Sequence, residues 1–205
     1  MFVNVKKVPS LTKCQILAWG HTDVSDDSRF RVLDQVEFIR QVMSAPARDQ
    51  LLSGDASIES IVETWKARTG IGKRVFFDGP IEDMAAIAAK KCLAKADFYP
   101  RQVDVIVGGT NTGPGYPSLA DHIKLRLDDE SSMAMAFDMT EACSVGAESI
   151  MVAWSLIQSG FAQSVLVVCA ERATTLTSPD NWKEANLFGD AAFAAGMFDL
   201  DRDVG

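Results

Sequence analysis

Residues 137–146 read FDMTEACSVG, and they lead from a predicted strand into a predicted helix with a thiol at the bend. The run 133–139 is mostly apolar and has the length of a strand, whereas 145–157 is apolar nearly all round, which predicts a fully buried helix. The amide N–H groups and positive dipole end of that helix would face Cys143, and both favour the thiolate. Such a bend is typical of a nucleophile, although a free cysteine can also be a small buried apolar residue.

Apolar runs of strand length and helix length alternate along most of the chain. Strands are predicted over 13–19, 74–77, 103–107, 133–139, 164–169 and 191–198, and helices over 58–68, 81–96, 118–127 and 144–159. This alternation predicts an α/β domain in which helices flank a mixed or largely parallel sheet. The stretch 108–115, GGTNTGPG, is expected to be a loop at the carboxyl end of a strand, where ligands of such sheets commonly bind.

Length and composition are those of a globular chain with its own core. The 205 residues are 47% hydrophobic and 23% charged, so we treat 1–205 as a single domain. A polar stretch at about 21–54 surrounds an amphipathic run at 32–43, which predicts an inserted helical surface cap rather than a partner-binding lid. No run approaches the roughly 18 apolar residues of a membrane span, and the first residues lack the apolar core of a secretion signal. We therefore expect a cytoplasmic protein that makes no membrane contact.

The cysteines, histidines and net charge argue against several other kinds of site. The four cysteines lie far apart without a Cys-x-x-Cys pair, and there are only two histidines, so no disulfide framework and no metal site are predicted. Residues expected in the core are Cys14, Cys92 and Cys169. The net charge of −8 argues against nucleic-acid binding, which needs a basic face. The glycine-rich loop lacks both the Gly-Lys-Ser/Thr ending of a phosphate loop and the third glycine of a dinucleotide site.

Four short motifs stand in the order and spacing of one enzyme family. They are RTGI at 68–71, YPS at 116–118, EAC at 141–143 before a helix of small residues, and FGDAA at 188–192. Over about 57–199 the chain resembles β-ketoacyl-[acyl-carrier-protein] synthase III, a condensing enzyme of the thiolase fold. The match covers the family's N-terminal half. The resemblance implies one half of the duplicated αβαβα core of that fold.

The resemblance also implies a role for each matched residue. Cys143 would be the catalytic nucleophile that accepts an acyl group from a thioester, and Phe188 would line the acyl cavity beside it. Arg68 and Thr69 would lie at the mouth of the pantetheine tunnel, and Tyr116 would close the acyl pocket of a partner subunit. Without the resemblance, Arg68 is a cation at a helix C-terminus, Tyr116 an exposed turn aromatic and Phe188 an ordinary core residue.

The chain departs from the family pattern where coenzyme A would bind. The family's tryptophan position falls on Thr64, and Trp65 follows one residue later, which turns the ring about 100° round a helix axis. Asn181 and Trp182 stand where the family has a second arginine. The sequence therefore does not distinguish acyl-coenzyme A from acyl-carrier protein as the donor of the acyl group. No cofactor is expected. Docking of an acidic carrier protein would need a local basic patch, for which the candidates are Lys66, Arg68, Lys73 and Arg74.

Two functions are compatible with the sequence. The first is an acyltransferase of ketoacyl synthase III type in fatty-acid or polyketide biosynthesis, as an N-terminal domain or one subunit. The family stabilises the enolate with His and Asn from its C-terminal half, and neither His21 nor His122 matches that position. The second is a non-catalytic thiolase-fold subunit that pairs with an active synthase. In both, half a thiolase fold lacks its second layer, so we expect a homodimer or a partner subunit, with the loop 108–118 and the strand 164–169 near the interface.

Overall fold

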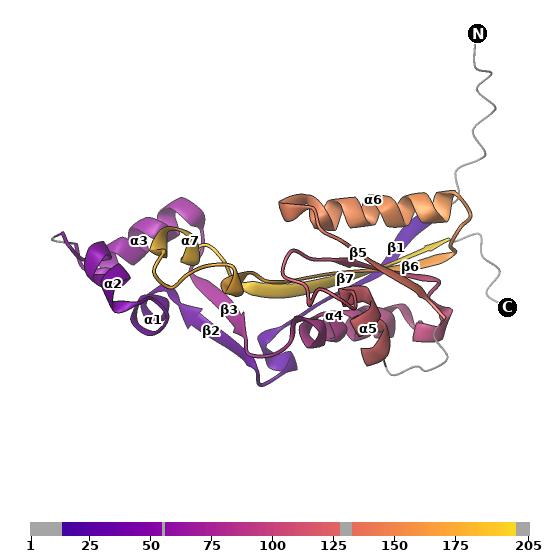
Figure 1. The fold of residues 1–205 in the computed structure, drawn as a ribbon, viewed down its shortest axis with the longest axis horizontal. Helices are drawn as coiled ribbons and strands as arrows, with labels where there is room; N and C mark the ends of the chain where they lie inside the picture. The colour runs from indigo at the N-terminus through magenta and orange to yellow at the C-terminus, as the bar shows by residue number, and fades with distance from the viewer. Residues whose placement is uncertain (1–13, 55, 128–132, 200–205) are drawn as a thin grey trace, which may run out of the picture.

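The computed structural model describes residues 14–54, 56–127 and 133–199, which form an elongated molecule with a large and a small lobe (Figure 1). The large lobe is built on a five-stranded sheet in the order β1-β7-β6-β4-β5. Its strands are β1 (Cys14–His21), β7 (Asp190–Asp199), β6 (Ser164–Arg172), β4 (Val105–Gly109) and β5 (Met135–Met139). Strand β4 is parallel to β5 and β6, whereas β7 is antiparallel to β6 and β1. Within the described residues β1 and β5 are the edges, and β6, expected near an interface, is paired on both sides.

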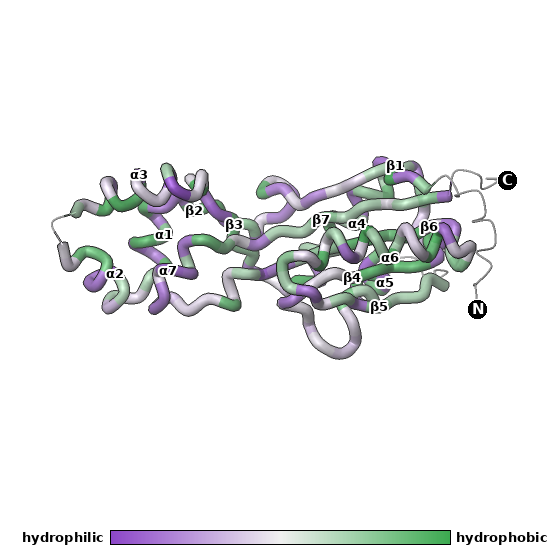
Figure 2. The backbone as a smooth tube through the Cα atoms, turned by 90° about the horizontal axis from the view of Figure 1, so that it is seen from above, coloured by the Kyte–Doolittle hydropathy of each residue, from purple (hydrophilic) through white to green (hydrophobic). Residues whose placement is uncertain are grey.

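Helices cover the two faces of this sheet unequally. Helices α4 (Ile81–Ala96) and α5 (Leu119–Arg126) lie on one face, and α6 (Val145–Gln158) lies on the other (Figure 1). The alanine-rich face of α4 allows close approach to β1, where a Cβ on Gly20 would lie 2.4 Å from the carbonyl oxygen of Ala88. The sheet strands are coloured mainly apolar in Figure 2, as their burial between these helices requires. The α/β architecture predicted from alternation is confirmed.

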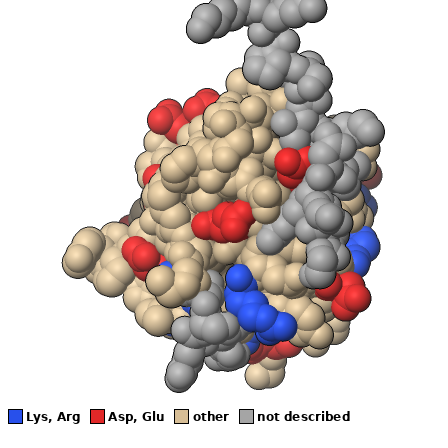
Figure 3. Space-filling model, turned by 90° about the vertical axis from the view of Figure 1, so that its right-hand side faces the viewer, with Lys and Arg blue, Asp and Glu red and all other residues tan. Residues whose placement is uncertain are grey.

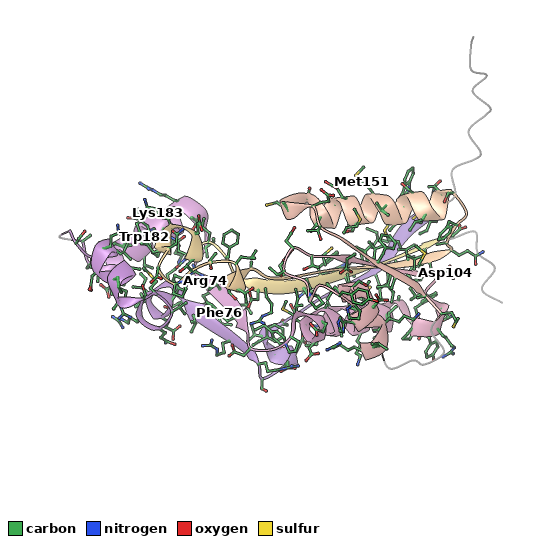
Figure 4. The ribbon with its side chains drawn as sticks, viewed as in Figure 1. Arg74, Phe76, Asp104, Met151, Trp182 and Lys183 are labelled. Carbon is green, nitrogen blue, oxygen red and sulfur yellow. The ribbon has the colours of Figure 1, made fainter. Side chains whose placement is uncertain are left out.

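Helix α6 is not fully buried, which corrects the prediction from its apolar composition. The side against the sheet is made of small and medium residues, namely Val145, Ser149, Ala153 and Ile157. The opposite side leaves Met151 66% and Trp154 44% exposed, and Figure 4 shows Met151 on the side away from the sheet. Helix α6 is thus apolar on two sides. The described residues cover the side that faces the sheet and leave the other side exposed.

Strand β4 begins two residues later than predicted and includes the two glycines that were expected in a loop. Residues Pro100–Gln102 form the 3-10 turn η2, and the Asp104 carboxylate accepts hydrogen bonds from the Gln163 and Ser164 amides (2.7 and 3.0 Å). At the other end, a Cβ on Gly108 would lie 2.3 Å from Oδ1 of Asp138. That carboxylate accepts from the first amides of α5, Leu119 and Ala120 (2.6 and 2.9 Å). The glycine is therefore needed for this close approach.

The small lobe has its own two-stranded sheet and its own apolar core (Figures 1 and 2). Its elements are β2 (Phe30–Asp34), α1 (Gln35–Gln41), α2 (Ala45–Leu51), α3 (Ile58–Thr69), β3 (Lys73–Phe77) and α7 (Trp182–Ala185). The core is centred on Phe38, Ile39 and Met43. The predicted insertion at 21–54 holds the 3-10 turn η1 (Val24–Asp26), β2, α1 and α2, so it contains a strand as well as helices.

The amphipathic run 32–43 is divided by a capping box. The Asp34 carboxylate accepts from the Glu37 amide (2.8 Å), and the Glu37 carboxylate accepts from the Asp34 amide (2.9 Å). These reciprocal bonds satisfy two backbone donors at the start of α1 and end β2 at Asp34.

Arg74 lies inside the small lobe, which removes it from the candidate basic patch. Its guanidinium donates to the Gln35 side chain (2.8 Å) and to the carbonyls of Ala185 and Asn186, and it lies 4.0 Å from the Phe38 ring centroid. Burial lowers the pKa of Arg74 to about 10, so it is charged at neutral pH. Figure 4 shows Arg74 in the small lobe, near the start of β7.

On the end of the large lobe seen in Figure 3, most of the described surface is uncharged, with several separate acidic side chains and with basic side chains at the lower centre and the right edge. None of the helices in the described part of the chain combines the length and the apolar character needed to cross a bilayer.

Asp190 joins the two lobes through hydrogen bonds to its buried carboxylate. Its carboxylate accepts from the Phe77 amide of β3 (2.9 Å) and from the amide and hydroxyl of Thr174 (3.0 and 2.8 Å). The Asp190 side chain is almost completely buried; its hydrogen bond to Phe77 is buried, and those to Thr174 are part-buried, so water competes little for these donors.

We expect Asp190→Ala to lower the free energy of unfolding by about 3 kcal/mol, because it leaves buried donors without an acceptor. Urea denaturation measures the change. Asp180→Ala, at an exposed carboxylate nearby in the chain, is the matched control and should change the stability little. Equal stability of the two variants would contradict the role of Asp190.

Candidate functional site

Cys143 lies at the edge of the large sheet where the parallel strands β4, β5 and β6 end. It is the middle residue of η3 (Ala142–Ser144), a single 3-10 turn between β5 and α6, and its side chain is exposed. The thiol borders a pocket of about 490 Å³. The apolar lining residues are Ala142, Val145, Ala173, Leu176 and Phe188, and the polar ones are Asn111 and Glu171. The pocket therefore combines a reachable thiol with a mainly apolar wall.

The residue before the thiol has a backbone conformation that is rare outside glycine. Ala142 has φ of +46°, in the left-handed region, which costs about 1 kcal/mol for an L-residue with a Cβ. Its N–H donates to Oδ1 of Asn111 (2.9 Å), and its carbonyl accepts from Nδ2 of the same side chain (3.1 Å). Both polar groups of the strained residue are thus bound by one amide from the loop after β4.

A carboxylate from the end of β6 holds that amide in turn. Oε1 of Glu171 accepts from the backbone N–H and from Nδ2 of Asn111, both at 2.7 Å. Oε2 accepts from the Thr112 hydroxyl (2.6 Å). Sequence reasoning missed Asn111 and Glu171. Both follow predicted strands by a few residues, and the available signal was that carboxyl ends of adjacent parallel strands meet at one edge.

The other three cysteines are shielded, and their chemistry differs from that of Cys143. Burial raises the pKa of the Cys92 thiol and of the Cys169 thiol to about 11. Partial burial, with the nearby Asp199 carboxylate, raises the pKa of Cys14 as well. Because the thiolate is the reactive form, these three thiols are poor nucleophiles at neutral pH.

The pocket brings together two of the predicted site residues, Cys143 and Phe188. Arg68 and Thr69 lie on the last turn of α3 in the small lobe and are exposed. Tyr116 is 98% exposed in the loop between β4 and α5. These three residues do not line the Cys143 pocket, so their predicted roles concern surfaces outside it.

Trp65 packs within the small lobe. Its ring stacks on Trp182, with centroids 5.8 Å apart and an interplanar angle of 14°, beside the apolar core. Figure 4 places Trp182 and Lys183 at the surface of this lobe. The one-residue offset noted in the sequence thus directs the Trp65 ring toward Trp182.

Neither histidine lines the Cys143 pocket. The His21 ring stacks on Trp19 on β1 (5.6 Å), and His122 lies on α5 with its ring near the Arg126 guanidinium (3.4 Å). Within the described ranges, no group of three His, Cys, Asp or Glu side chains is arranged to hold a metal ion.

Comparison with known proteins identifies the relatives of this chain. A family model described as 3-oxoacyl-[acyl-carrier-protein (ACP)] synthase III matches residues 137–199, which include the turn with Cys143 and α6. The β-ketoacyl-[acyl-carrier-protein] synthase III of Clostridium perfringens is 33% identical over 153 residues, 72% of this chain and 46% of that protein. The enzyme of the same name from Bacillus pumilus is 34% identical over 155 residues, 72% of this chain and 49% of that protein.

This is a β-ketoacyl-[acyl-carrier-protein] synthase III-like chain. It has the thiolase fold of its solved neighbours. The 3-oxoacyl-[acyl-carrier-protein] synthase III of Aquifex aeolicus superposes with a TM-score of 0.74 at 27% identity, over 94% of this chain and 55% of the other. A priming β-ketosynthase from a polyketide pathway superposes with a TM-score of 0.75 at 26% identity, over 97% and 53%. The synthase III-like chain spans about half the length of the curated relatives it matches.

We expect iodoacetamide to label Cys143 faster than Cys14, Cys92 and Cys169 at neutral pH, because it is the exposed thiol. Labelling of Cys92 and Cys169 should become appreciable only as the pH rises toward their raised pKa of about 11. Peptide mapping after timed labelling measures each site. Preferential labelling of another cysteine at neutral pH would show that Cys143 is not the reactive thiol.

Proposed function

We propose that this chain is the acyl-accepting part of a ketoacyl synthase III-type acyltransferase in fatty-acid or polyketide-type biosynthesis. The observation that carries the proposal is the exposed thiol of Cys143 at a strand–helix bend, beside a mainly apolar pocket. A thiol in that position can take an acyl group, and the apolar wall can hold its chain. We place the reaction in the cytoplasm, where the composition led us to expect the protein.

The proposed step exchanges one thioester for another. The Cys143 thiolate attacks the carbonyl carbon of the donor thioester, and a new carbon–sulfur bond forms at Sγ. The donor's carbon–sulfur bond breaks, and the released thiolate takes up the proton that Cys143 gave up. Leu176 and Phe188 would contact the acyl chain, since they form the apolar side of the pocket. The donor is acyl-coenzyme A or an acyl-carrier protein, and no cofactor takes part.

We assign condensation with a malonyl-type thioester to groups outside this chain. That step leaves an enolate, which needs hydrogen-bond donors placed at its oxygen. His21 lies on β1 and His122 on α5, and neither borders the pocket. A second thiolase-fold half, in a C-terminal segment or a partner subunit, would supply the missing donors.

We expect the chain to become acylated on Cys143 when incubated with an acyl-coenzyme A or an acyl-carrier protein, and to form no ketoacyl product when a malonyl-thioester is added. Intact-mass measurement and peptide mapping detect the acyl adduct. Cys143→Ala should abolish the adduct, whereas Cys14→Ala, the matched control, should retain it. Absence of any adduct on Cys143 would favour the non-catalytic partner subunit, and ketoacyl product from this chain alone would refute the assignment of condensation elsewhere.

We propose further that a homodimer or a partner subunit covers the α6 side of the large sheet. Met151 and Trp154 are exposed on α6, and Phe193 is exposed on β7 opposite Cys169, which packs on the same core as α6. At about 25 cal/mol per Å² of apolar area, covering a few hundred Å² contributes several kcal/mol to association.

We expect light scattering to give more than the mass of one chain at micromolar concentration, and Trp154→Glu to shift the chain toward monomer by placing a charge in the covered face. Leu125→Glu, at an exposed residue of α5 on the other face of the sheet, is the matched control and should not change the mass. If the chain requires a different subunit, it should instead be a monomer that binds an apolar dye. A monomer that binds no dye would contradict the proposal.

A further inference from the structure

We propose that Asn111 is a positioning residue for Cys143 and that Glu171 fixes Asn111 in its working orientation. The inference rests on the proposed role of Cys143 as the acyl-accepting nucleophile. It concerns hydrogen bonds contributed by the ends of β4 and β6, which follow β5 in the sheet order, and β5 leads into the turn that carries the thiol.

The contacts of Asn111 act on the backbone that carries the thiol. Its side-chain amide accepts from the N–H of Ala142 and donates to the carbonyl of Ala142, so it spans the two peptide groups that flank this residue. The second of these peptides joins Ala142 to Cys143. With both peptides held, Ala142 stays in its left-handed conformation, and the direction in which Cys143 leaves the turn is fixed.

Glu171 determines which of its two possible orientations the Asn111 side-chain amide adopts. Nδ2 of Asn111 faces two acceptors, the Glu171 carboxylate (2.7 Å) and the Ala142 carbonyl (3.1 Å). The reverse orientation would place Oδ1 against both acceptors and the amino group against the Ala142 N–H. The carboxylate is itself held by the backbone N–H of Asn111 and by the Thr112 hydroxyl, so one orientation of the whole group satisfies every donor.

The hydrogen bonds between the Asn111 side chain and Ala142 are solvent-exposed. Their effect on the position of Cys143 can therefore be separated from their effect on folding. A hydrogen bond that water can replace contributes little to global stability, in contrast to a buried one. Loss of the Asn111 amide should therefore alter the reactivity of Cys143 much more than the unfolding free energy. A nearby contact offers a comparison. The Thr140 hydroxyl donates to the Thr110 carbonyl (3.0 Å), joining the same two loops without touching Ala142.

The first test compares rates of Cys143 modification by iodoacetamide and by an acyl-thioester. We expect Asn111→Ala to slow both about tenfold, the effect of roughly one to two lost hydrogen bonds on a reaction barrier. Asn111→Asp should be at least as slow, because it keeps the shape but turns an oxygen toward both acceptors. Glu171→Gln should have a smaller effect. Thr140→Ala, the matched control, should stay within about twofold of the wild type.

A rescue experiment tests whether Asn111 acts through the left-handed residue. Glycine adopts positive φ without steric cost, so Ala142→Gly in the Asn111→Ala background should recover much of the lost rate. Urea denaturation of Asn111→Ala should show a midpoint close to the wild type. A large fall in stability, or a rate that glycine does not restore, would assign Asn111 a structural role and overturn the inference.

The outcomes separate this inference from the proposed function. If Cys143 of the wild type is modified no faster than Cys14, Cys92 and Cys169, the proposed function fails and the positioning role fails with it. If the wild type reacts rapidly at Cys143 and both Asn111 variants react equally rapidly, the proposed function stands and the positioning role is refuted.

Discussion

The parallel pairing of β4 with both β5 and β6 is the constraint on which the rest of the site depends. In this register Gly109 lies opposite Met139 on one side and Cys169 on the other. Asn111 and Glu171 stand two residues beyond Gly109 and Cys169 and consequently meet, and the turn after Met139 carries Cys143. A shift of one residue in either pairing would turn these side chains to the opposite face of the sheet. The register of these three strands therefore brings the turn with Cys143 next to Asn111 and Glu171.

Helix α6 shows how one element can encode two interfaces. Its sheet side is narrow and made of residues such as Ser149 and Ala153, which allow the helix to lie close to β4 and β6. Its bulkier apolar residues, Met151 and Trp154, point away from the sheet. The prediction of a fully buried helix was wrong for this chain because hydropathy records how much apolar surface a helix has, and not how much of it the same chain covers.

Periodicity predicted the long helices and the order of the large strands because their apolar faces are local patterns. It failed at β2, where a strand and a helix share one amphipathic run and only the capping box between Asp34 and Glu37 marks their boundary. In the site, the strand–helix bend predicted Cys143, and the structure places Phe188 in its pocket. Asn111 and Glu171 were missed because their contact depends on the long-range register of β4 and β6, which periodicity along the chain does not record.

Arg74 links the small lobe to the wall of the pocket. Burying a cation is costly, and the Gln35 side chain and the carbonyls of Ala185 and Asn186 offset part of that cost by accepting from the two terminal nitrogens, whereas the buried Nε has no partner among the described residues. Those carbonyls belong to the segment that leads directly to Phe188, while Asp190 fixes the same segment from its other end. The position of Phe188 is therefore held between two buried side chains, Arg74 of the small lobe and Asp190 of the large lobe. The small lobe therefore helps to hold Phe188 in the pocket wall, although no lining residue of the pocket lies on β2, α1 or α3.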